Sequence, residues 1–150
     1  MIVRPATEED IGELVEMGRR MHEEGAYAFL PYEAEKVRRL ITGLVERPDC
    51  SCALVAEHDH GLAGMLGGYL TDYFFCDAKV ACDLVLFVER DYRGSSAAAR
   101  LIQGFREWAR ARGARELCLG ISTNINTEAI GRFYRSLGFT QVGGIYKQRL

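Results

Sequence analysis

Apolar residues in the first third of the chain recur at the spacing of an α-helix. They return every three or four positions between residues 11 and 21 and again between 37 and 45, which predicts two amphipathic helices on one core. Thr7 and Asp10 have the spacing of a capping box before the first helix, and Pro48 ends the second. The stretch between these helices, 23–32, is aromatic but aperiodic, so we expect a packed loop there.

The middle of the chain changes to the pattern of β-strands. Apolar runs at 52–57 and 62–70 flank a polar turn and predict a β-hairpin, and a third run at 81–88 predicts another strand. A short strand at residues 2–3 precedes the first helix. The hairpin turn carries the sequence His-Asp-His at 58–60, which we interpret as a solvated turn and not as a metal site, because no further ligand is evident.

The last third alternates helix and strand. The pattern predicts a helix that ends at Gly113, a strand over 116–122 and a short helix that ends at Gly138. One or two final strands are expected in 139–150, where they complete the sheet or cross a homodimer interface. Hairpins supply antiparallel pairs, and the strand–helix–strand unit between Cys82 and Ser122 supplies a parallel crossover. The fold class is therefore α/β with a mixed sheet.

Composition restricts the class of protein. Hydrophobic residues make up 48% of the 150 positions, which fits one domain over residues 1–150 with a continuous core. The formal charge is −2, from 19 basic and 21 acidic residues, so we expect no nucleic-acid partner. No signal-peptide pattern and no apolar run long enough to span a bilayer are present, so we expect a cytoplasmic protein without a membrane partner.

The cysteines are expected to be reduced residues of the core. They are odd in number, lie mostly within apolar runs and include no C-x-x-C pair, which is typical of a cytosolic protein without disulfides. They are Cys50, Cys52, Cys76, Cys82 and Cys118.

The bend between the strand at 81–88 and the following helix carries mostly small side chains. A helix N-terminus has unpaired N–H groups and a partial positive charge, so an unobstructed one attracts phosphate. Arg90 and Arg93 lie beside it in the sequence and could add charge-assisted hydrogen bonds. The alternative is that small residues only allow the helix to pack closely on the sheet. The small residues are Gly94, Ser95, Ser96, Ala97 and Ala98.

The segment from Arg93 to Ala98 resembles the Arg/Gln-x-x-Gly-x-Gly/Ala pyrophosphate loop of the GNAT superfamily of N-acetyltransferases. Arg93 and Ala98 match this pattern, whereas Ser96 stands where the family usually has glycine. The stretches RPATEEDIGELVEM, VERDYRG and FYRSLGF are also similar to the family's first strand and helix, its approach to the cofactor and its late Tyr-x-x-x-Gly-Phe segment. Thr127 stands where many members carry asparagine, and Asn126 lies one residue earlier.

This resemblance implies a mixed, largely antiparallel central sheet with a parallel β-α-β crossover and helices on both faces. It also implies transfer of an acetyl group from acetyl-CoA to a primary amine of a small molecule or peptide, by direct attack in a ternary complex and without a metal. The alternative is a catalytically inactive module that binds acyl-CoA as a sensor or interaction domain. The implied cofactor-binding residues are Leu86, Phe87, Val88, Arg93, Gly94, Ser95, Ser96, Ala97, Ala98, Asn126 and Tyr134.

Three residues are candidates for proton transfer. The resemblance assigns Tyr134 as the acid that protonates the departing thiolate, because a phenol stays protonated at neutral pH. Asp83 lies within an apolar strand, where a carboxylate is costly unless it is paired or faces a cleft, and Glu89 at the strand end is the alternative base or an ordinary ion-paired acid. Alternation along the strand places Asp83 on the face of Phe87, unless a bulge intervenes.

Two segments are expected to form the walls of the acceptor pocket. These are 23–32 and 70–79, whose acids and aromatic residues would suit a cationic amine. The backbone N–H of Val88 is a candidate donor for the developing oxyanion.

Overall fold

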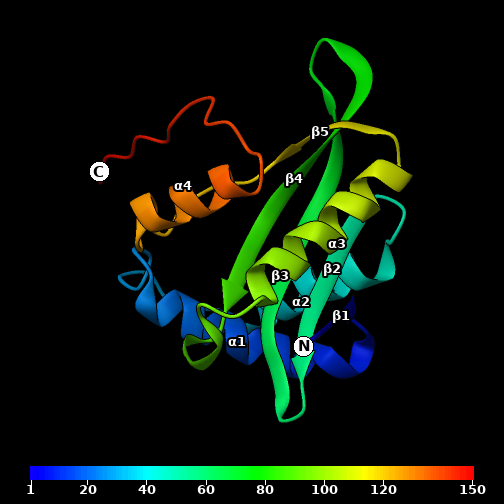
Figure 1. Ribbon diagram of the computed structural model, residues 1–150. Helices are drawn as coiled ribbons and strands as arrows, with labels where there is room; N and C mark the ends of the chain where they lie inside the picture. The colour runs from blue at the N-terminus through cyan, green and yellow to red at the C-terminus, as the bar shows by residue number, and fades with distance from the viewer.

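A computed structural model describes all 150 residues (Figure 1). The elements, in chain order, are β1 (Ile2–Pro5), the 3-10 turn η1 (Glu8–Asp10), α1 (Ile11–Glu24), α2 (Ala34–Glu46), β2 (Ser51–His58), β3 (Gly61–Tyr73), β4 (Cys76–Val88), the 3-10 turn η2 (Arg90–Tyr92), α3 (Ala97–Ala111), β5 (Ala114–Cys118) and α4 (Thr127–Ser136).

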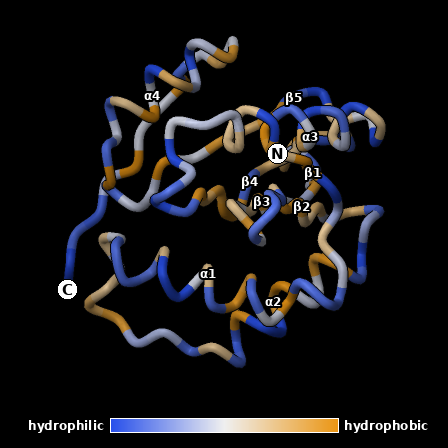
Figure 2. The backbone as a smooth tube through the Cα atoms, turned by 60° about the horizontal axis from the view of Figure 1, so that its bottom comes forward, coloured by the Kyte–Doolittle hydropathy of each residue, from blue (hydrophilic) through white to orange (hydrophobic).

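The five strands form one sheet in the order β1-β2-β3-β4-β5. The pairs from β1 to β4 are antiparallel, and β4 pairs with β5 in parallel through the α3 crossover. Helices lie on both faces: α1 and α2 pack on one face and α3 packs on the other (Figure 2). The expected fold class, a mixed and largely antiparallel sheet with one parallel crossover, is confirmed.

Each face of the sheet has its own hydrophobic cluster. Beneath α3 the fully buried side chains include Leu101, Ile102 and Phe105, which pack against alternate residues of β2 to β4. On the opposite face, Met17 of α1 and Phe87 of β4 belong to a second cluster. Burial of apolar surface on both faces fixes the register of the central strands, because a slip of one residue would exchange the two faces.

The predicted capping box is confirmed. The Asp10 carboxylate accepts the Thr7 N–H at 2.8 Å, and the Thr7 hydroxyl donates to the same carboxylate at 3.1 Å. Arg4 of β1 forms a bidentate ion pair with Asp10, in which Nη1 and Nη2 donate to the two carboxylate oxygens at 2.7 and 2.9 Å. Its hydrogen bonds lower the pKa of Asp10 below the ordinary value. The start of the first helix is thereby attached to the edge strand of the sheet.

The β3–β4 hairpin is longer than expected and contains a β-bulge. Gly67 pairs with Val85, but Gly68 pairs with Asp83, so Leu84 is an extra residue in β4. A Cβ on Gly68 would lie 2.5 Å from the Phe105 ring, so glycine is needed for α3 to lie close to the sheet at this point.

Several expectations are wrong. The tail at 139–150 contains no strand, and β5 ends at Cys118, four residues earlier than the apolar run suggests. The cysteines are free, as expected, but Cys50, Cys76 and Cys118 are exposed and only Cys52 is fully buried. The apolar residues around these cysteines in the sequence did not reveal whether a cysteine lies in the core, on an edge strand or at the end of a hairpin. Separately, no helix has the length and apolar character needed to cross a membrane.

Candidate functional site

The two parallel strands separate shortly after they begin to pair. Residues 79–82 of β4 pair with residues 114–118 of β5, and the last pair is Cys82 with Cys118. Beyond this point β5 turns away toward α4, while β4 continues to Val88 beside β3 (Figure 1). The β5-side edge of β4 is therefore unpaired over residues 83–88.

The unpaired edge presents backbone hydrogen-bonding groups. The Glu89 N–H donates to Ala63 O of β3 at 2.9 Å. Because successive residues of an antiparallel pair point alternately to the two sides, the backbone groups of Leu86 and Val88 point to the unpaired edge. The Val88 carbonyl already accepts a hydrogen bond from Arg93 Nε at 3.0 Å, whereas the Val88 N–H is free for a ligand.

The backbone and side chain of Phe87 face other directions than those of Leu86 and Val88, its neighbours among the predicted cofactor-binding residues. Its backbone pairs with Met65 of β3, and its buried ring belongs to the hydrophobic cluster beneath α1 and α2. The Phe87 ring also lies beneath the Arg93 guanidinium, at 5.4 Å. Leu86 and Val88 pack instead against the cluster under α3.

The predicted phosphate loop leads from this edge into α3. Its Arg93, Ser95 and Ala97 N–H groups are taken by Arg90 O, Tyr92 O and Ser95 Oγ. No protein acceptor binds the N–H groups of Gly94, Ser96, Ala98 and Ala99. The small side chains thus leave four free amides at a helix N-terminus, which suits an anion.

Two backbone conformations shape this loop. Gly94 has φ of +84°, in the left-handed region that favours glycine. Ser96 has φ of −77° and ψ of 0°, so serine fits the helical conformation at the position where the family usually has glycine. Both serines are exposed, and neither side chain is buried against the sheet.

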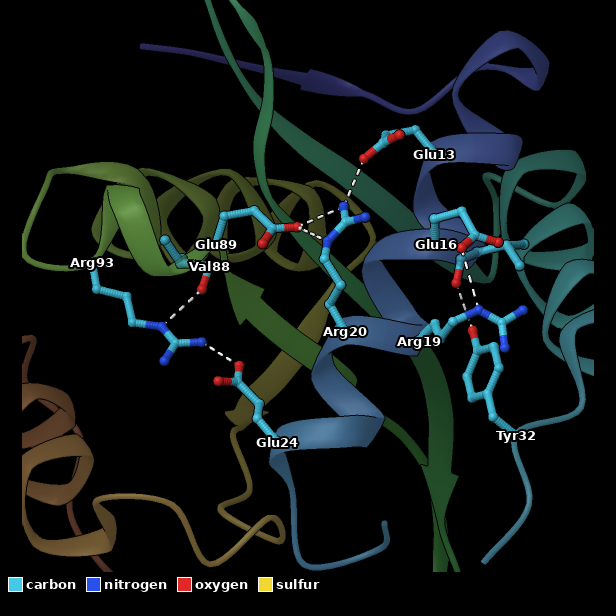
Figure 3. Close-up of polar contacts among 10 residues, drawn as sticks. Glu13, Glu16, Arg19, Arg20, Glu24, Tyr32, Val88, Glu89 and Arg93 are labelled. Atoms are coloured by element: carbon cyan, nitrogen blue, oxygen red, sulfur yellow. Dashed lines mark hydrogen bonds and ion pairs between the residues drawn. The ribbon is translucent and has the colours of Figure 1, made fainter.

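Both arginines at this loop are bound by one acidic residue. Arg93 and Arg90 both form ion pairs with Glu24, the last residue of α1, and Figure 3 shows the Arg93 pair. Burial raises the pKa of Glu24, but the hydrogen bonds from these arginines outweigh it and hold the pKa below the ordinary value. Arg90 bonds to Glu24 through Nε, and Arg93 bonds to Val88 O through Nε and to Glu24 through Nη2. Each guanidinium therefore keeps donors that these contacts do not use.

Asp83 lies at the point where β4 and β5 separate. Its Oδ1 accepts the Gly120 N–H at 2.9 Å, and burial raises the pKa of this carboxyl to about 6. The expectation that Asp83 shares a face with Phe87 is wrong. The bulge at Leu84 reverses the alternation and places Asp83 with Ala81, toward the α3 and α4 side of the sheet.

Tyr134 of α4 faces the same point. Its hydroxyl donates to Gly120 O at 3.5 Å, a long contact that a ligand could readily replace. Burial and the nearby Asp83 carboxylate raise the pKa of Tyr134 above the ordinary value. The structure therefore brings the predicted acid Tyr134 and the predicted base Asp83 together around one residue, Gly120.

The other two candidates are less directly placed. Glu89 forms an ion pair with Arg20 of α1 at 2.7 Å, and Arg20 also pairs with Glu13 (Figure 3). This arrangement matches the interpretation of Glu89 as an ion-paired acid. Asn126 occupies the N-cap position of α4 with φ of 47°, but its side chain makes no capping hydrogen bond.

Two cavities flank the separated strands. The smaller, of about 450 Å³, lies between the end of α1 and the start of η2 and is lined by Glu24, Phe87 and Glu89 among others. The larger, of about 1730 Å³, is lined by the residues after β5, by α4 and by the tail, and it includes Tyr134. Segment 23–32 contributes to both cavities, as expected.

Segment 70–79 lines neither of these two cavities. It forms the projecting end of the β3–β4 hairpin (Figure 1), where Phe74 is 99% exposed and Phe75 is 69% exposed. No group of three or more His, Cys, Asp or Glu side chains lies close enough together to hold a metal ion.

The sequence profile of the acetyltransferase (GNAT) family matches residues 15–139. This chain belongs to the GNAT family. Its first strand lies outside the matched range, which covers the open edge of β4, the loop before α3 and Tyr134. No curated protein matches the sequence.

Several solved structures have the same fold at low sequence identity. AAC(6')-Iy in complex with the bisubstrate analog CoA-S-monomethyl-acetylneamine has a TM-score of 0.78 and 17% identity, with 99% of this chain and 98% of that chain covered. Glucosamine-6-phosphate N-acetyltransferase from Arabidopsis thaliana has a TM-score of 0.77 and 14% identity over 99% and 97%. A transcriptional regulator from Bacillus halodurans has a TM-score of 0.80 and 22% identity over 99% of each chain.

Sequence reasoning missed two participants in this site. Glu24 holds both loop arginines from 66 and 69 residues away, and Gly120 connects Asp83 to Tyr134 through its backbone. Neither has a local motif. In the sequence, only the acidic end of the first helix, which precedes an aromatic loop, pointed to Glu24.

Proposed function

We propose that this GNAT chain transfers an acetyl group from acetyl-CoA to a primary amine, which attacks the thioester directly in a ternary complex. The observation that supports this best is the continuity of the unpaired edge of β4 with the free amides of Gly94, Ser96 and Ala98. An extended arm with a diphosphate at one end fits such a surface, since one part pairs with a strand edge and the other with a helix N-terminus.

The residues present fit the cofactor that the family uses. Backbone groups of Leu86 and Val88 would bind the pantetheine arm, and the free amides of Gly94, Ser96, Ala98 and Ala99 would bind the pyrophosphate. When bound, acetyl-CoA supplies the activated acyl group and the thiolate leaving group. The Val88 N–H is the donor that we assign to the developing negative charge on the carbonyl oxygen.

Asp83 and Tyr134 would divide the proton transfers. With a pKa of about 6, Asp83 is mostly ionised at pH 7.5 and can accept a proton from the attacking amine, directly or through water. Tyr134 keeps its proton at that pH, as a phenol with the ordinary pKa of about 10 does, and it can donate this proton to the thiolate. Burial raises the pKa of both groups, and their protonation states differ because their ordinary pKa values, 3.8 and 10.0, lie on opposite sides of neutral pH.

The test is a comparison of turnover with affinity in Tyr134→Phe, with Tyr69→Phe on the exposed surface of β3 as the matched control. Loss of a general acid lowers the rate by about 10²-fold or more. We expect kcat to fall by this factor in Tyr134→Phe while the Kd for CoA, from calorimetry, changes less than threefold. Full activity of this variant would overturn the assignment of the acid.

The second candidate function is a binding module without turnover. The ion pair of Arg93 with Glu24 favours it, because this pair occupies part of the guanidinium that would assist the loop. Both functions require CoA binding, but only the enzyme acetylates an amine. Saturable CoA binding without acetylation of any member of a broad amine panel would favour the module.

A further inference from the structure

The larger cavity carries an excess of positive charge. Only one acidic side chain lines it, that of Glu116, which accepts a hydrogen bond from Tyr73. The cavity is lined by four cationic side chains, and none of them forms an ion pair. These are Arg106, Arg135, Lys147 and Arg149.

Two of these cations lie together beside the loop that follows α1. Lys147 donates to the Tyr27 hydroxyl and, at 3.3 Å, to Ser122 O, and its ammonium lies 4.2 Å from the centre of the Tyr27 ring. The Arg149 guanidinium lies 3.8 Å from the centre of the Phe29 ring. Aromatic rings hold both cations at the cavity wall without neutralising them.

This charge is separate from the predicted pyrophosphate site. No residue of the loop 93–98 lines the larger cavity, whereas Tyr134 does. Lys147 bonds to Ser122 O and Tyr134 bonds to Gly120 O, two residues earlier in the same segment. Two residues of extended chain span at most about 7 Å, so the ammonium and the phenol oxygen are no more than about 14 Å apart. A small acceptor can bridge that distance.

We propose that the acceptor of this enzyme carries an anionic group, a carboxylate or a phosphate, that Lys147 and Arg149 bind while its amine lies at Tyr134. This inference rests on the proposed acetyl transfer. Cations without carboxylate partners form charge-assisted hydrogen bonds with an anion and repel a second ammonium group. A polycationic amine is therefore disfavoured, in contrast to the cationic acceptor that the sequence suggested.

The test uses pairs of acceptors that differ only in the anionic group. Glucosamine 6-phosphate is compared with glucosamine, phosphoethanolamine with ethanolamine, and β-alanine with β-alaninamide. Two charge contacts with exposed side chains, as Lys147 and Arg149 are, correspond to roughly tenfold in affinity. We expect kcat/KM to be at least tenfold higher for the anionic member of at least one pair, mainly through KM. The phosphate and carboxylate arms separate the two sources of negative charge.

A double variant tests the residues themselves. Lys147→Met with Arg149→Met should reduce the preference for the anionic member toward onefold, whereas Arg132→Met should keep it. Arg132 is an exposed cation of α4 that pairs with Glu128 and does not line the cavity. A double variant that keeps the wild-type preference for the anionic acceptor would overturn the inference.

The experiment distinguishes failure of the anionic-acceptor proposal from failure of the acetyl-transfer proposal. Turnover of the amines without an anionic group that equals or exceeds that of their anionic partners would overturn the anionic acceptor and leave acetyl transfer intact. Absence of turnover with every amine, despite CoA binding, would overturn acetyl transfer and the acceptor class together.

Discussion

Replacement of Asp83 with asparagine should stabilise the protein at neutral pH while it damages the active site. The carboxylate is held half-buried next to Tyr134, and burial raises its pKa from 3.8 to about 6. An asparagine has a similar shape, and its oxygen can still accept the Gly120 N–H at 2.9 Å. The variant therefore removes a buried negative charge with little change in packing.

The magnitude follows from the pKa shift. Each unit of pKa difference between the folded and unfolded chains corresponds to about 1.4 kcal/mol, so a rise from 3.8 to about 6 gives roughly 3 kcal/mol. Between pH 4 and pH 6 the folded chain binds the extra proton, so the wild-type free energy of unfolding falls as pH rises and levels off above the folded pKa. Asp83→Asn lacks this decline.

Urea unfolding at pH 4, 5, 6, 7 and 8 measures the effect as a difference between variant and wild type. We expect this difference to grow in favour of Asp83→Asn by up to about 3 kcal/mol from pH 4 to pH 8. Asp77→Asn, on the exposed hairpin end, controls for the loss of a surface carboxylate. A difference that is independent of pH, or that grows in the opposite direction, would refute the burial argument.

Three further predictions concern other parts of the chain. Asp10→Ala removes the helix cap and the ion pair with Arg4, so urea titrations at pH 7 should show a free energy of unfolding that is lower by about 2–3 kcal/mol. Because the pKa of Asp10 is lowered in the folded chain, the wild-type protein should lose this stabilisation as the pH falls below about 4. Gly94→Ala meets no neighbouring atom but must adopt φ of +84°, so calorimetry should show up to about tenfold weaker CoA binding, from roughly 1–2 kcal/mol of strain. Burial raises the pKa of Cys52 to about 12 and that of Cys82 to about 11. A chromogenic disulfide reagent at pH 8 should therefore label these two thiols much more slowly than the other three, Cys50, Cys76 and Cys118.

The sequence pattern predicted the central elements well because their periodicity reflects burial. The helix stripes and the strand runs correspond to side chains that pack on one face or the other, so α1, α3 and the β2–β3 hairpin lie close to their expected positions. Gly113 and Gly138 end their helices with positive φ, as a left-handed C-terminal cap requires.

The errors arise where burial depends on distant partners. The apolar letters of 139–150 suggested strands, but residues such as Val142 and Tyr146 are almost fully exposed and pair with nothing in the sheet. The bulge at Leu84 depends on the register of β3, and alternation along β4 alone could not reveal it. The Glu24 ion pairs join residues at least 66 positions apart, so no local pattern could have predicted them.

The most direct test of the account is to follow the backbone amides of a ¹⁵N-labelled sample during titration with CoA and with pantetheine, which lacks the phosphates. We predict that the signals of Gly94, Ser96 and Ala98, whose N–H groups have no protein acceptor, shift strongly with CoA and little with pantetheine. Signals that stay unchanged at saturating CoA, or that shift equally with both ligands, would contradict binding of a diphosphate at the start of α3.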